Sequence, residues 1–518
     1  MAMGTVVSRG TGVLRVLVLT YVLGISPLAD AFNLANTIPN MLYDIVIGGV
    51  VGATFIPVFI ERLAHAKNED EAWESISSVV TVAVVILASA TVIFLAAAPW
   101  LINAFTAFDH VQLTKDPQSL AQQRHIATVL LRWFVPQLFF YGLLSIGGAL
   151  LNVRRRFGAP MWVPIANNLV CIAVLIAFAS VAPSPSLASV SMHPSQLVLL
   201  GAGTTAGVAI QFLLLTPSLL RAKLGRLRWN FNLRDRAVRS VVQLGSWTFG
   251  FVIANQIALF VVIALAFGTG GSGPVSSYTY AYAFMQMPYA VVAISVMNAV
   301  TPDLATHHAQ KDIDAFIKRF GKGLRSTLAI MIPASIAMFL LAKPIIELLL
   351  GHGNASAEQT RLTGVALAEL SLGLVGFTAF QYVIRALQSM RSVKVAFVLY
   401  LIENAINIGL AVLLMHPLGL AGITLSVSIA YSVAAVLGLA YLHAHLGHLG
   451  PPRCYRALLR VVTASVAMGI VIVVFSNLSA STSLSSLMER VFGSLIVGGL
   501  AYLGVISLLG RRRRTPLR

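Results

Sequence analysis

Two arginines stand in an otherwise apolar stretch near the start of the chain. Arg9 precedes the apolar run from Gly10 to Leu28, and Arg15 lies inside it. Arginine stays charged at accessible pH, and placing it at the centre of a bilayer costs about 2.5–3.5 kcal/mol. It therefore usually faces protein or a water-filled cavity. The pair predicts a membrane protein that binds an anion; the alternative is a pair of anchors whose side chains reach the membrane surface.

Both arginines can act on one ligand if the stretch is helical. Six residues place their side chains about 120° apart around the helix and about 9 Å apart along its axis, so both can line one wall of a cleft. Asp30 follows in the next segment. We expect Asp30 to pair with one of the arginines or to orient it.

The composition is that of a membrane protein. Of the 518 residues, 57% are hydrophobic and 10% are charged, whereas soluble domains carry about 25% charged residues. The apolar residues form runs of roughly 20–30, long enough to cross a hydrocarbon core about 30 Å thick. We predict an all-α polytopic fold with fourteen transmembrane spans, at residues 5–26, 30–60, 77–106, 127–151, 159–182, 196–220, 240–267, 275–303, 326–350, 362–387, 395–416, 419–442, 459–478 and 487–510.

The net charge of +18 follows the expected topology. With the N-terminus in the cytoplasm, 28 of the 36 lysines and arginines fall in cytoplasmic segments. This is the positive-inside distribution. We therefore expect no nucleic-acid partner, and we predict a multi-pass protein of the bacterial plasma (inner) membrane with both termini cytoplasmic.

A sparse internal repeat predicts two lobes. Residues 140–168 align on residues 377–405 with a constant offset, and each copy reads as a span, a short basic turn and a span with an asparagine. The alternative is chance similarity between apolar segments. Parallel repeats are typical of two-lobed transporters. We predict an N-lobe over residues 1–225, a C-lobe over 226–446, and two further helices with a basic tail over 447–518.

Motifs for enzymatic chemistry are missing from the sequence. It has no Walker motif, no His-Glu-x-x-His and no Cys-x-x-Cys, and no loop is long enough for a soluble catalytic domain. We expect a transporter without a cofactor, driven by a sodium gradient or by the membrane potential.

The N-terminal motif carries a family resemblance. The pattern TxxSRxxGxxR at residues 5–15, followed by Asp-Ala-Phe at 30–32 and Pro-Asn at 39–40, resembles the start of the MurJ (MviN) family of lipid II flippases. Residues 136–142, 151–157 and 285–289 are similar to further family segments. The resemblance implies a V-shaped, two-lobed bundle with a cationic central cavity, in which the last two spans form a groove for a polyprenyl tail.

Two positions depart from the family pattern. Tyr43 and Ala283 stand where Gram-negative members often have arginine, so the cavity is expected to be less cationic, and Arg9 and Arg15 to carry more of the diphosphate recognition. The expected substrate site comprises Ser8, Arg9, Arg15, Asp30, Asn40 and Tyr43.

A second polar cluster predicts a cation site. Glu403 and Asn407 are four residues apart and share a helix face. Thr424 and Asn255 could complete a set of oxygen ligands, and some members of the resembled family have a sodium site in this lobe. The alternative is hydrogen bonding between helices. In the preceding span, Arg385 is expected to be an anchor at the cytoplasmic end.

The resemblance implies a lipid II flippase. Such a protein moves the undecaprenyl-diphosphate-linked peptidoglycan precursor from the inner to the outer leaflet by alternating access, for cell-wall synthesis and cell shape. The expected partners are lipid II, membrane lipids and the cell-wall synthesis machinery. Two alternatives stay open within the same superfamily: a polysaccharide-lipid flippase and a multidrug antiporter. A membrane-embedded glycosyl- or phosphotransferase would need a carboxylate cluster at a membrane face, which the sequence lacks.

Overall fold

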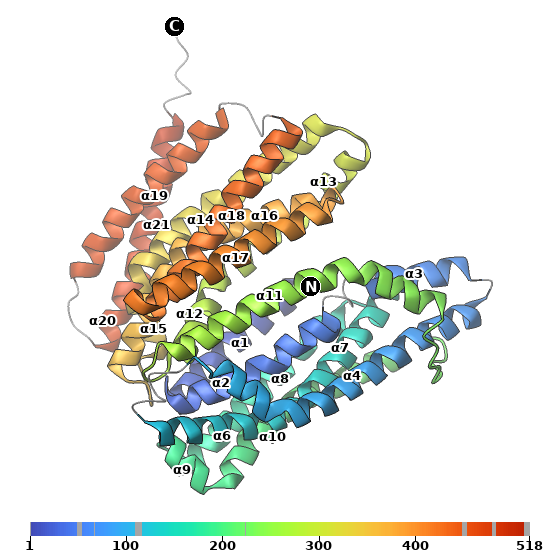
Figure 1. The fold of residues 1–518 in the computed structure, drawn as a ribbon. Coiled ribbons are helices and arrows are strands. Elements are labelled where there is room, and N and C mark those ends of the chain that lie inside the picture. Colours follow the sequence, from blue (N-terminus) through green and yellow to red (C-terminus); the bar gives the residue numbers. More distant parts are fainter. Residues whose placement is uncertain are drawn as a thin grey trace. The chain divides into compact units, whose positions relative to one another are not determined.

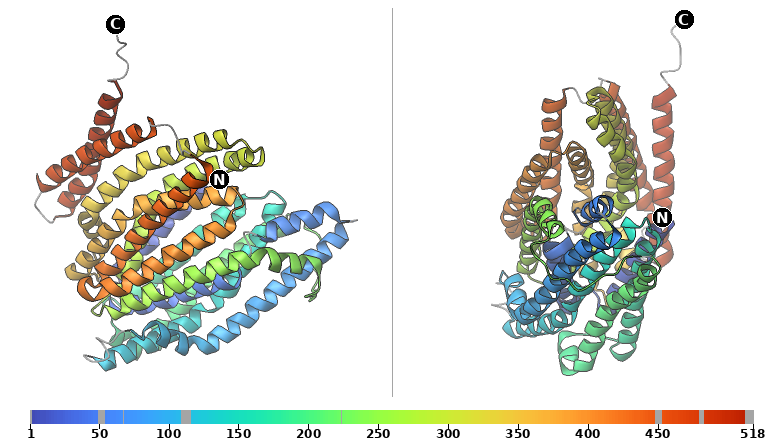
Figure 2. Two further views of the ribbon diagram at one scale, coloured as in Figure 1. Left: turned by 45° about the horizontal axis from the view of Figure 1, so that its top comes forward. Right: turned by 90° about the vertical axis from the view of Figure 1, so that its right-hand side faces the viewer.

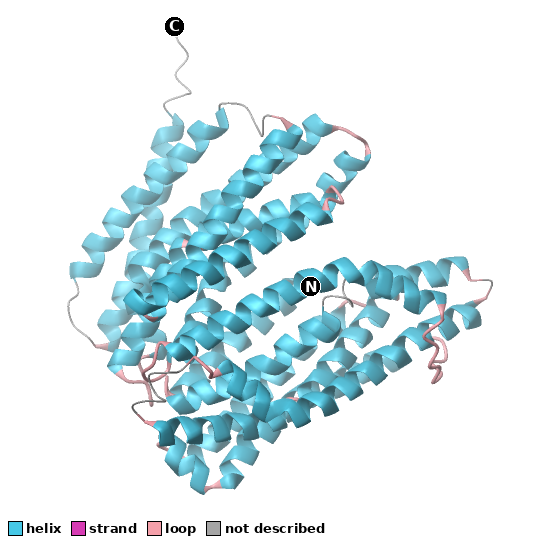
Figure 3. Cartoon of the chain, viewed as in Figure 1, coloured by secondary structure: helices cyan, strands magenta, loops and turns pink. Residues whose placement is uncertain are grey.

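The computed structural model describes residues 2–48, 54–66, 68–108, 116–222, 224–447, 453–478 and 483–511. In these ranges all regular structure is helical and there is no strand, as Figures 1 and 3 show. The predicted all-α class is confirmed. The chain divides into two compact units, which are described separately: Met1–Ser276 with Gly353–Ala355, and Ser277–His352 with Ser356–Arg518.

The first unit is built from long helices that pack side by side. Helix α1 packs along α8, α8 packs along α10, and α4 packs on α6, α7 and α11 (Figures 1 and 2). The bounds are α1 Ala2–Leu23, α2 Pro27–Tyr43, η1 Asp44–Gly48, α3 Ile56–His65, α4 Glu69–Phe105, α6 Pro117–Phe134, α7 Pro136–Val153, α8 Gly158–Val181, α9 Leu187–Met192, α10 Pro194–Leu220 and α11 Arg236–Gly268.

The second unit contains the remaining helices. Helix α17 packs along α18, and α19 packs on both α14 and α21. The bounds are α12 Pro274–Pro288, η3 Tyr289–Ala293, α13 Ile294–Ala309, α14 Ile313–Leu350, α15 Ala357–Leu372, α16 Leu374–Ser389, α17 Val393–Leu418, α18 Leu420–Leu446, α19 Arg453–Leu478, α20 Leu484–Met488, η4 Glu489–Gly493 and α21 Ser494–Arg511.

The boundary between the units differs from the predicted lobe boundary. We predicted it after residue 225, whereas the contacts place it after Ser276. The physical reason is the packing of α11, which contacts α4 and α3 and is therefore grouped with the first unit. The C-terminal helices are grouped with the second unit, because Met468 and Ile472 of α19 pack against Ala337 and Leu341 of α14.

Most of the predicted spans have a counterpart among the helices. Among the described residues, eleven helices are long and apolar enough to cross a membrane, or twelve if α15 and α16, bent by 47° at their junction, count as one span. The first two predicted spans correspond to α1 and to the interrupted segment from α2 to α3, which are not in that set. The total of fourteen stays a prediction.

One asparagine holds the arginine-bearing helix α1 against α8. The side-chain nitrogen of Asn168 donates to the carbonyl oxygen of Ser8 at 3.2 Å and to the hydroxyl of Thr11 at 3.0 Å. Arg9 lies between these two acceptors in the sequence. The orientation of α1 at this point is therefore set by a buried amide of the neighbouring helix.

A second asparagine holds the other end of α1. Asn354 donates its backbone N–H to the carbonyl of Tyr21 at 3.1 Å and its side-chain N–H to the carbonyl of Val22 at 2.7 Å. These carbonyls have no partner within the helix because they lie in its last turn. Gly24 follows at a φ of +69°, and a Cβ there would lie 2.4 Å from the carbonyl oxygen of Asn354. The chain therefore needs glycine at this turn.

Asp30 caps the start of α12. It is buried, and its Oδ1 accepts hydrogen bonds from the backbone N–H of Ser276 at 2.7 Å and from the hydroxyl of Ser276 at 2.6 Å. The Ser276 hydroxyl in turn accepts from the side-chain amide of Asn33 at 2.9 Å. Because α12 begins at Pro274, the carboxylate satisfies an N–H group of its first turn.

Replacing Asp30 by alanine leaves the Ser276 N–H buried without an acceptor. We expect the free energy of unfolding to fall by about 1–3 kcal/mol, the usual penalty for an unsatisfied buried donor. Thermal unfolding of the detergent-solubilised protein measures the change. The Asp30→Asn variant keeps an acceptor oxygen and should lose less stability. An alanine variant as stable as the wild type would contradict the capping role.

Candidate functional site

Arg15 is the centre of a polar cluster inside the first unit. It is half-buried. Its guanidinium group is an electrostatic neighbour of the Tyr141 hydroxyl of α7 and is hydrogen-bonded to the Cys171 thiol of α8. A charge in an apolar helix is tolerated where polar groups of neighbouring helices face it. Arg15 therefore faces the interior of the unit, unlike an arginine that extends to the membrane surface.

A chain of hydrogen bonds fixes the tyrosine beside Arg15. The Tyr141 hydroxyl donates to the side-chain oxygen of Gln137 at 3.3 Å, and Gln137 donates to the hydroxyl of Thr205 at 3.1 Å. The Thr205 hydroxyl donates to the backbone carbonyl of Trp133 at 2.6 Å. Because the Tyr141 proton is donated to Gln137, the lone pairs of the Tyr141 oxygen can accept a hydrogen bond from an arginine.

Tyr43 joins the same cluster from α2. Its ring lies 5.9 Å from the ring of Tyr141, centre to centre, and its hydroxyl is hydrogen-bonded to Ser145, one turn along α7 from Tyr141. The position at which the sequence resemblance implies a second arginine is thus occupied by a neutral hydroxyl. The structure brings Arg15 and Tyr43 together through Tyr141.

Three of these residues were not predicted from the sequence as part of the site. Tyr141 and Ser145 belong to an apolar helix in which nothing marks them as site residues, although Tyr141 lies within the family-like segment 136–142. Cys171 is a buried cysteine without a disulfide. All three residues are recognised by their contacts with a neighbouring helix, and spacing along one helix does not reveal such contacts.

The other predicted substrate residues lie in different surroundings. Arg9 is exposed on α1, and Asn40 is exposed on α2 with its side chain donating to the carbonyl of Asn36 at 2.8 Å. Ser8 contributes its carbonyl to the contact with α8. The expected pairing of Asp30 with an arginine is not observed. Asp30 is buried and accepts hydrogen bonds from the N–H and hydroxyl groups at the start of α12.

The predicted cation ligands are divided between the two units, and their role as a cation site stays a prediction. Asn255 lies on α11 in the first unit, and the other three lie in the second. Thr424 donates to the carboxylate of Glu369 at 2.9 Å, and Asn407 accepts from the hydroxyl of Ser426 at 3.0 Å. Both are contacts between helices, the alternative considered for these residues. No group of three or more His, Cys, Asp or Glu residues able to hold a metal is found in the described ranges.

Glu403 stands apart from these pairs. It is 1% exposed, and its Oε2 atom has no hydrogen-bond partner among the described residues. Its electrostatic neighbours are tyrosines on α12 and α18 together with the nearby Tyr400. A buried carboxylate without a partner is costly, so it must be neutralised by a proton or a cation.

The second unit also has an arginine beside tyrosines. Arg385 of α16 is exposed and is an electrostatic neighbour of Tyr289 and Tyr400. The Tyr400 hydroxyl donates to the side-chain oxygen of Gln381 at 3.1 Å, one turn before Arg385. The anchor role of Arg385 stays a prediction. Its surroundings repeat the combination of arginine, tyrosine and glutamine found around Arg15.

This arrangement suits an oxyanion. A guanidinium group offers charge-assisted, bidentate hydrogen bonds that match the geometry of phosphate oxygens. The Tyr141 hydroxyl lies beside Arg15, and the hydrogen-bonded hydroxyls of Tyr43 and Ser145 lie beside Tyr141. The first unit therefore presents one fixed positive charge with hydroxyl neighbours.

The chain is similar in sequence to known lipid II flippases. The sequence profile described as lipid II flippase MurJ matches residues 19–493. The chain is 26% identical to the lipid II flippase MurJ of Burkholderia cenocepacia over 444 residues, which cover 84% of this chain and 80% of the relative.

Solved structures share the fold. A structure of lipid II flippase MurJ in an inward closed conformation is 22% identical, covers 98% of both chains and has a TM-score of 0.79. An inward-facing multidrug resistance transporter of the MATE family, in the MOP superfamily, is 15% identical, covers 87% of this chain and 99% of its own, and has a TM-score of 0.69. At these identities the likeness establishes the fold alone.

The sequence match, and not the fold, distinguishes the lipid II flippases from the MATE transporters as relatives of this chain. It extends over most of the chain and includes Arg385, Glu403 and the helices α2, α7 and α8. The predicted polytopic helical membrane protein is thus a member of a transporter family. This chain belongs to the lipid II flippase MurJ family.

Proposed function

We propose that this protein is a lipid II flippase, which moves the polyprenyl-diphosphate-linked peptidoglycan precursor from the inner to the outer leaflet of the bacterial inner membrane. The observation that carries the proposal is the half-buried Arg15 with its hydroxyl neighbours, in a chain of the MurJ family. A diphosphate cannot cross hydrocarbon without a group that replaces its water. Arg15 is such a group, since it keeps its charge throughout the transport cycle.

Arg15 and Tyr43 form the core of the proposed diphosphate site. Arg15 supplies charge, while Tyr43 and Ser145 supply hydroxyl donors. Arg9, exposed six residues earlier on the same helix, meets the diphosphate first when it enters from the cytoplasm. Ser8 and Asn40 contribute polar groups at the edge of the site, and Asp30 acts through the position of α2.

Release requires weaker binding in the outward state. A transporter moves a ligand only if its affinity differs between its conformations. A site with one guanidinium and several neutral hydroxyls holds a diphosphate less firmly than a site with several arginines. The tyrosine at position 43 therefore favours release, and alternating access then needs a smaller change in affinity.

The energy source is proposed to act through Glu403. A sodium ion or a proton bound at this buried carboxylate neutralises it, and the membrane potential favours the inward movement of that positive charge. Each elementary charge is worth about 2.3 kcal/mol per 100 mV. Asn407, Thr424 and Asn255 stay candidate ligands of such an ion in other states of the cycle.

A multidrug antiporter is the second candidate. It is favoured by the likeness of the fold to the MATE transporter and by the buried carboxylate of Glu403, a group that such antiporters could use to bind a proton or a cationic drug. The arginine cluster opposes it, because a fixed positive charge repels cationic drugs. A polysaccharide-lipid flippase would share the diphosphate chemistry and differ only in the headgroup.

Depletion of the protein in its native host tests the function directly. We expect lipid II to accumulate in the inner leaflet, because its headgroup cannot cross the bilayer unaided. Leaflet-resolved labelling of lipid II measures this, and re-expression of the wild type serves as the control. An unchanged distribution between the leaflets would remove lipid II as the substrate.

Replacing Arg15 by alanine should abolish growth complementation in the depleted host. The expected loss is tenfold or more in flipping rate, since one charge-assisted hydrogen bond is worth about 1.5–3 kcal/mol. Arg15→Lys should recover only part of the activity, because a lysine cannot make the bidentate contact. Membrane fractionation checks insertion, and Arg221→Ala, which removes an exposed arginine at the end of α10, is the matched control. Full complementation by Arg15→Ala would show that Arg15 only anchors the helix.

The Glu403→Gln variant tests the coupling. It removes the ionisable group and keeps the shape, so flipping should lose its dependence on the ion gradient and on the membrane potential. Flipping in proteoliposomes, measured with and without an imposed potential or sodium gradient, reports this. Glu358→Gln, at an exposed position of α15, is the control. Equal dependence on potential and gradient in both variants would exclude Glu403 as the coupling site.

A further inference from the structure

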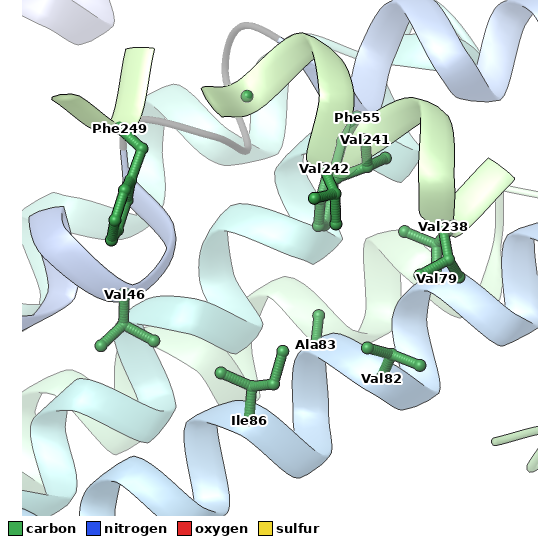
Figure 4. A pocket seen from close by; sticks show the side chains of 11 residues that line it. Val46, Phe55, Val79, Val82, Ala83, Ile86, Val238, Val241, Val242 and Phe249 are labelled. Carbon is green, nitrogen blue, oxygen red and sulfur yellow. The ribbon is translucent and has the colours of Figure 1, made fainter. Parts of the chain in front are cut away.

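An apolar groove runs between α4 and α11 in the first unit. Its volume is about 300 Å³. Helix α11 lines it with Val238, Val241, Val242, Gly245 and Phe249, whose spacing of three, one, three and four residues defines one helix face. Figure 4 shows these side chains opposite those of α4.

Helix α4 forms the other wall with the same periodicity. Val79, Val82, Ala83 and Ile86 follow each other at helical spacing and face the groove (Figure 4). From Val238 to Phe249 the groove extends over eleven residues, which is about 16 Å along α11. This is about half of a hydrocarbon core of about 30 Å, the depth of one leaflet.

Basic residues gather at one end of the groove. Between Arg221 and Arg239 the chain has seven lysines and arginines and one acidic residue, Asp235. Asp235 is already engaged: it caps α11 at the N–H of Ala237 and accepts from the Ser75 hydroxyl of α4 at 3.3 Å. Arg236 and Arg239 are exposed in the first turn of α11, directly beside Val238. The acids of α4 lie at residues 69–74, before the groove begins.

The segment before α11 has the composition of a membrane-surface anchor. Residues 224–232 are not helical and run along α4, where the backbone N–H groups of Arg228 and Asn230 donate to Ser77 at 3.1 Å and Thr81 at 3.2 Å. Large apolar side chains alternate with polar ones along it and are exposed, with Trp229 at 73%. Tryptophan is enriched where the headgroups meet the hydrocarbon.

We propose that the α4–α11 groove and the basic segment from Arg226 to Arg239 together bind an anionic phospholipid of the cytoplasmic leaflet. One acyl chain occupies the groove, and the phosphate of the headgroup lies against Arg234, Arg236 and Arg239. The depth of the groove matches an acyl chain, which ends at the bilayer midplane, and a polyprenyl chain is longer than that. The site adds to the proposed flippase function and does not depend on it.

The cytoplasmic placement follows from the charge distribution, since basic residues accumulate on that side of the membrane. The cytoplasmic leaflet is also the one whose anionic lipids attract polybasic segments. The bound lipid would fill an open apolar surface and place its phosphate beside the exposed Arg236 and Arg239.

Lipid retention by the full-length protein tests the proposal. The protein is purified in mild detergent, mixed with phosphatidylglycerol or phosphatidylcholine, and analysed by native mass spectrometry without substrate. We expect preferential retention of phosphatidylglycerol. The triple variant Arg234→Gln, Arg236→Gln, Arg239→Gln should bind it at least about tenfold more weakly, because each basic residue near a lipid surface contributes appreciably.

Matched variants separate this site from general charge and surface effects. Lys318→Gln, Lys322→Gln, Arg391→Gln removes three exposed cations of the second unit and should leave retention unchanged. Val242→Trp closes the groove, and Val436→Trp changes a residue of α18 that is equally exposed, at 66%. Only the first tryptophan variant should reduce binding.

Three results would overturn the proposal. They are equal retention by the wild type and the arginine variant, an equal loss in the second-unit triple variant, and displacement of phosphatidylglycerol from the wild type by an equimolar polyprenyl diphosphate. The last result would assign the groove to the substrate tail. The retention experiment does not measure flipping, so a negative result does not bear on the proposed flippase function. A failed depletion test likewise does not bear on the binding of phosphatidylglycerol.

Discussion

The guanidinium group of Arg15 is the constraint on which the first unit depends. It cannot lose its charge, and it lies half-buried on a helix whose other residues are largely apolar. Its position is tolerable only because α7 and α8 present a tyrosine and a cysteine toward it. The hydrogen bonds of Asn168 and Asn354 hold α1 near both of its ends, so that the charge stays where those partners are. The polar contacts of α1 thus serve one purpose, which is to keep a cation at a fixed place in an apolar unit.

The substitution of tyrosine for a second cation changes the character of this site. Two guanidinium groups close together repel each other and need an anion, or an acid such as aspartate, to stay folded in an apolar environment. With Tyr43 in that place no such acid is required. Asp30 is accordingly engaged elsewhere, at the start of α12. The site therefore holds a single guanidinium group without a carboxylate partner, and Asp30 has a structural role at the start of α12.

The sequence predicts the class of the fold well and the partners of its polar residues poorly. Apolar runs and the distribution of lysine and arginine depend on the membrane, which acts on every residue in the same way, so composition alone indicates a helical membrane protein.

The partners of polar residues depend on which helices become neighbours. Ser276 lies 246 residues from Asp30, and Glu369 lies 55 residues from Thr424. Helical spacing placed Glu403 and Asn407 on one face, yet Asn407 bonds to α18 while Glu403 faces tyrosines. The residue types and the resemblance both single out Arg15, whereas Tyr141 of α7 becomes visible only through its proximity to Arg15 in the structure.

Each unit contains a buried or half-buried charge that its own side chains do not neutralise, and the two charges have opposite signs. Arg15 has hydroxyl and thiol neighbours but no carboxylate among its partners, and Glu403 has an oxygen without a hydrogen bond among the described residues. An anionic ligand stabilises the first, and a proton or cation stabilises the second. If each ligand prefers one conformation of the protein, then the binding of either must change the affinity for the other by the same factor, because binding free energies are linked. Two uncompensated charges in separate units are therefore enough, in thermodynamic terms, to couple an ion to the movement of an anionic lipid, and no direct contact between the two ligands is needed.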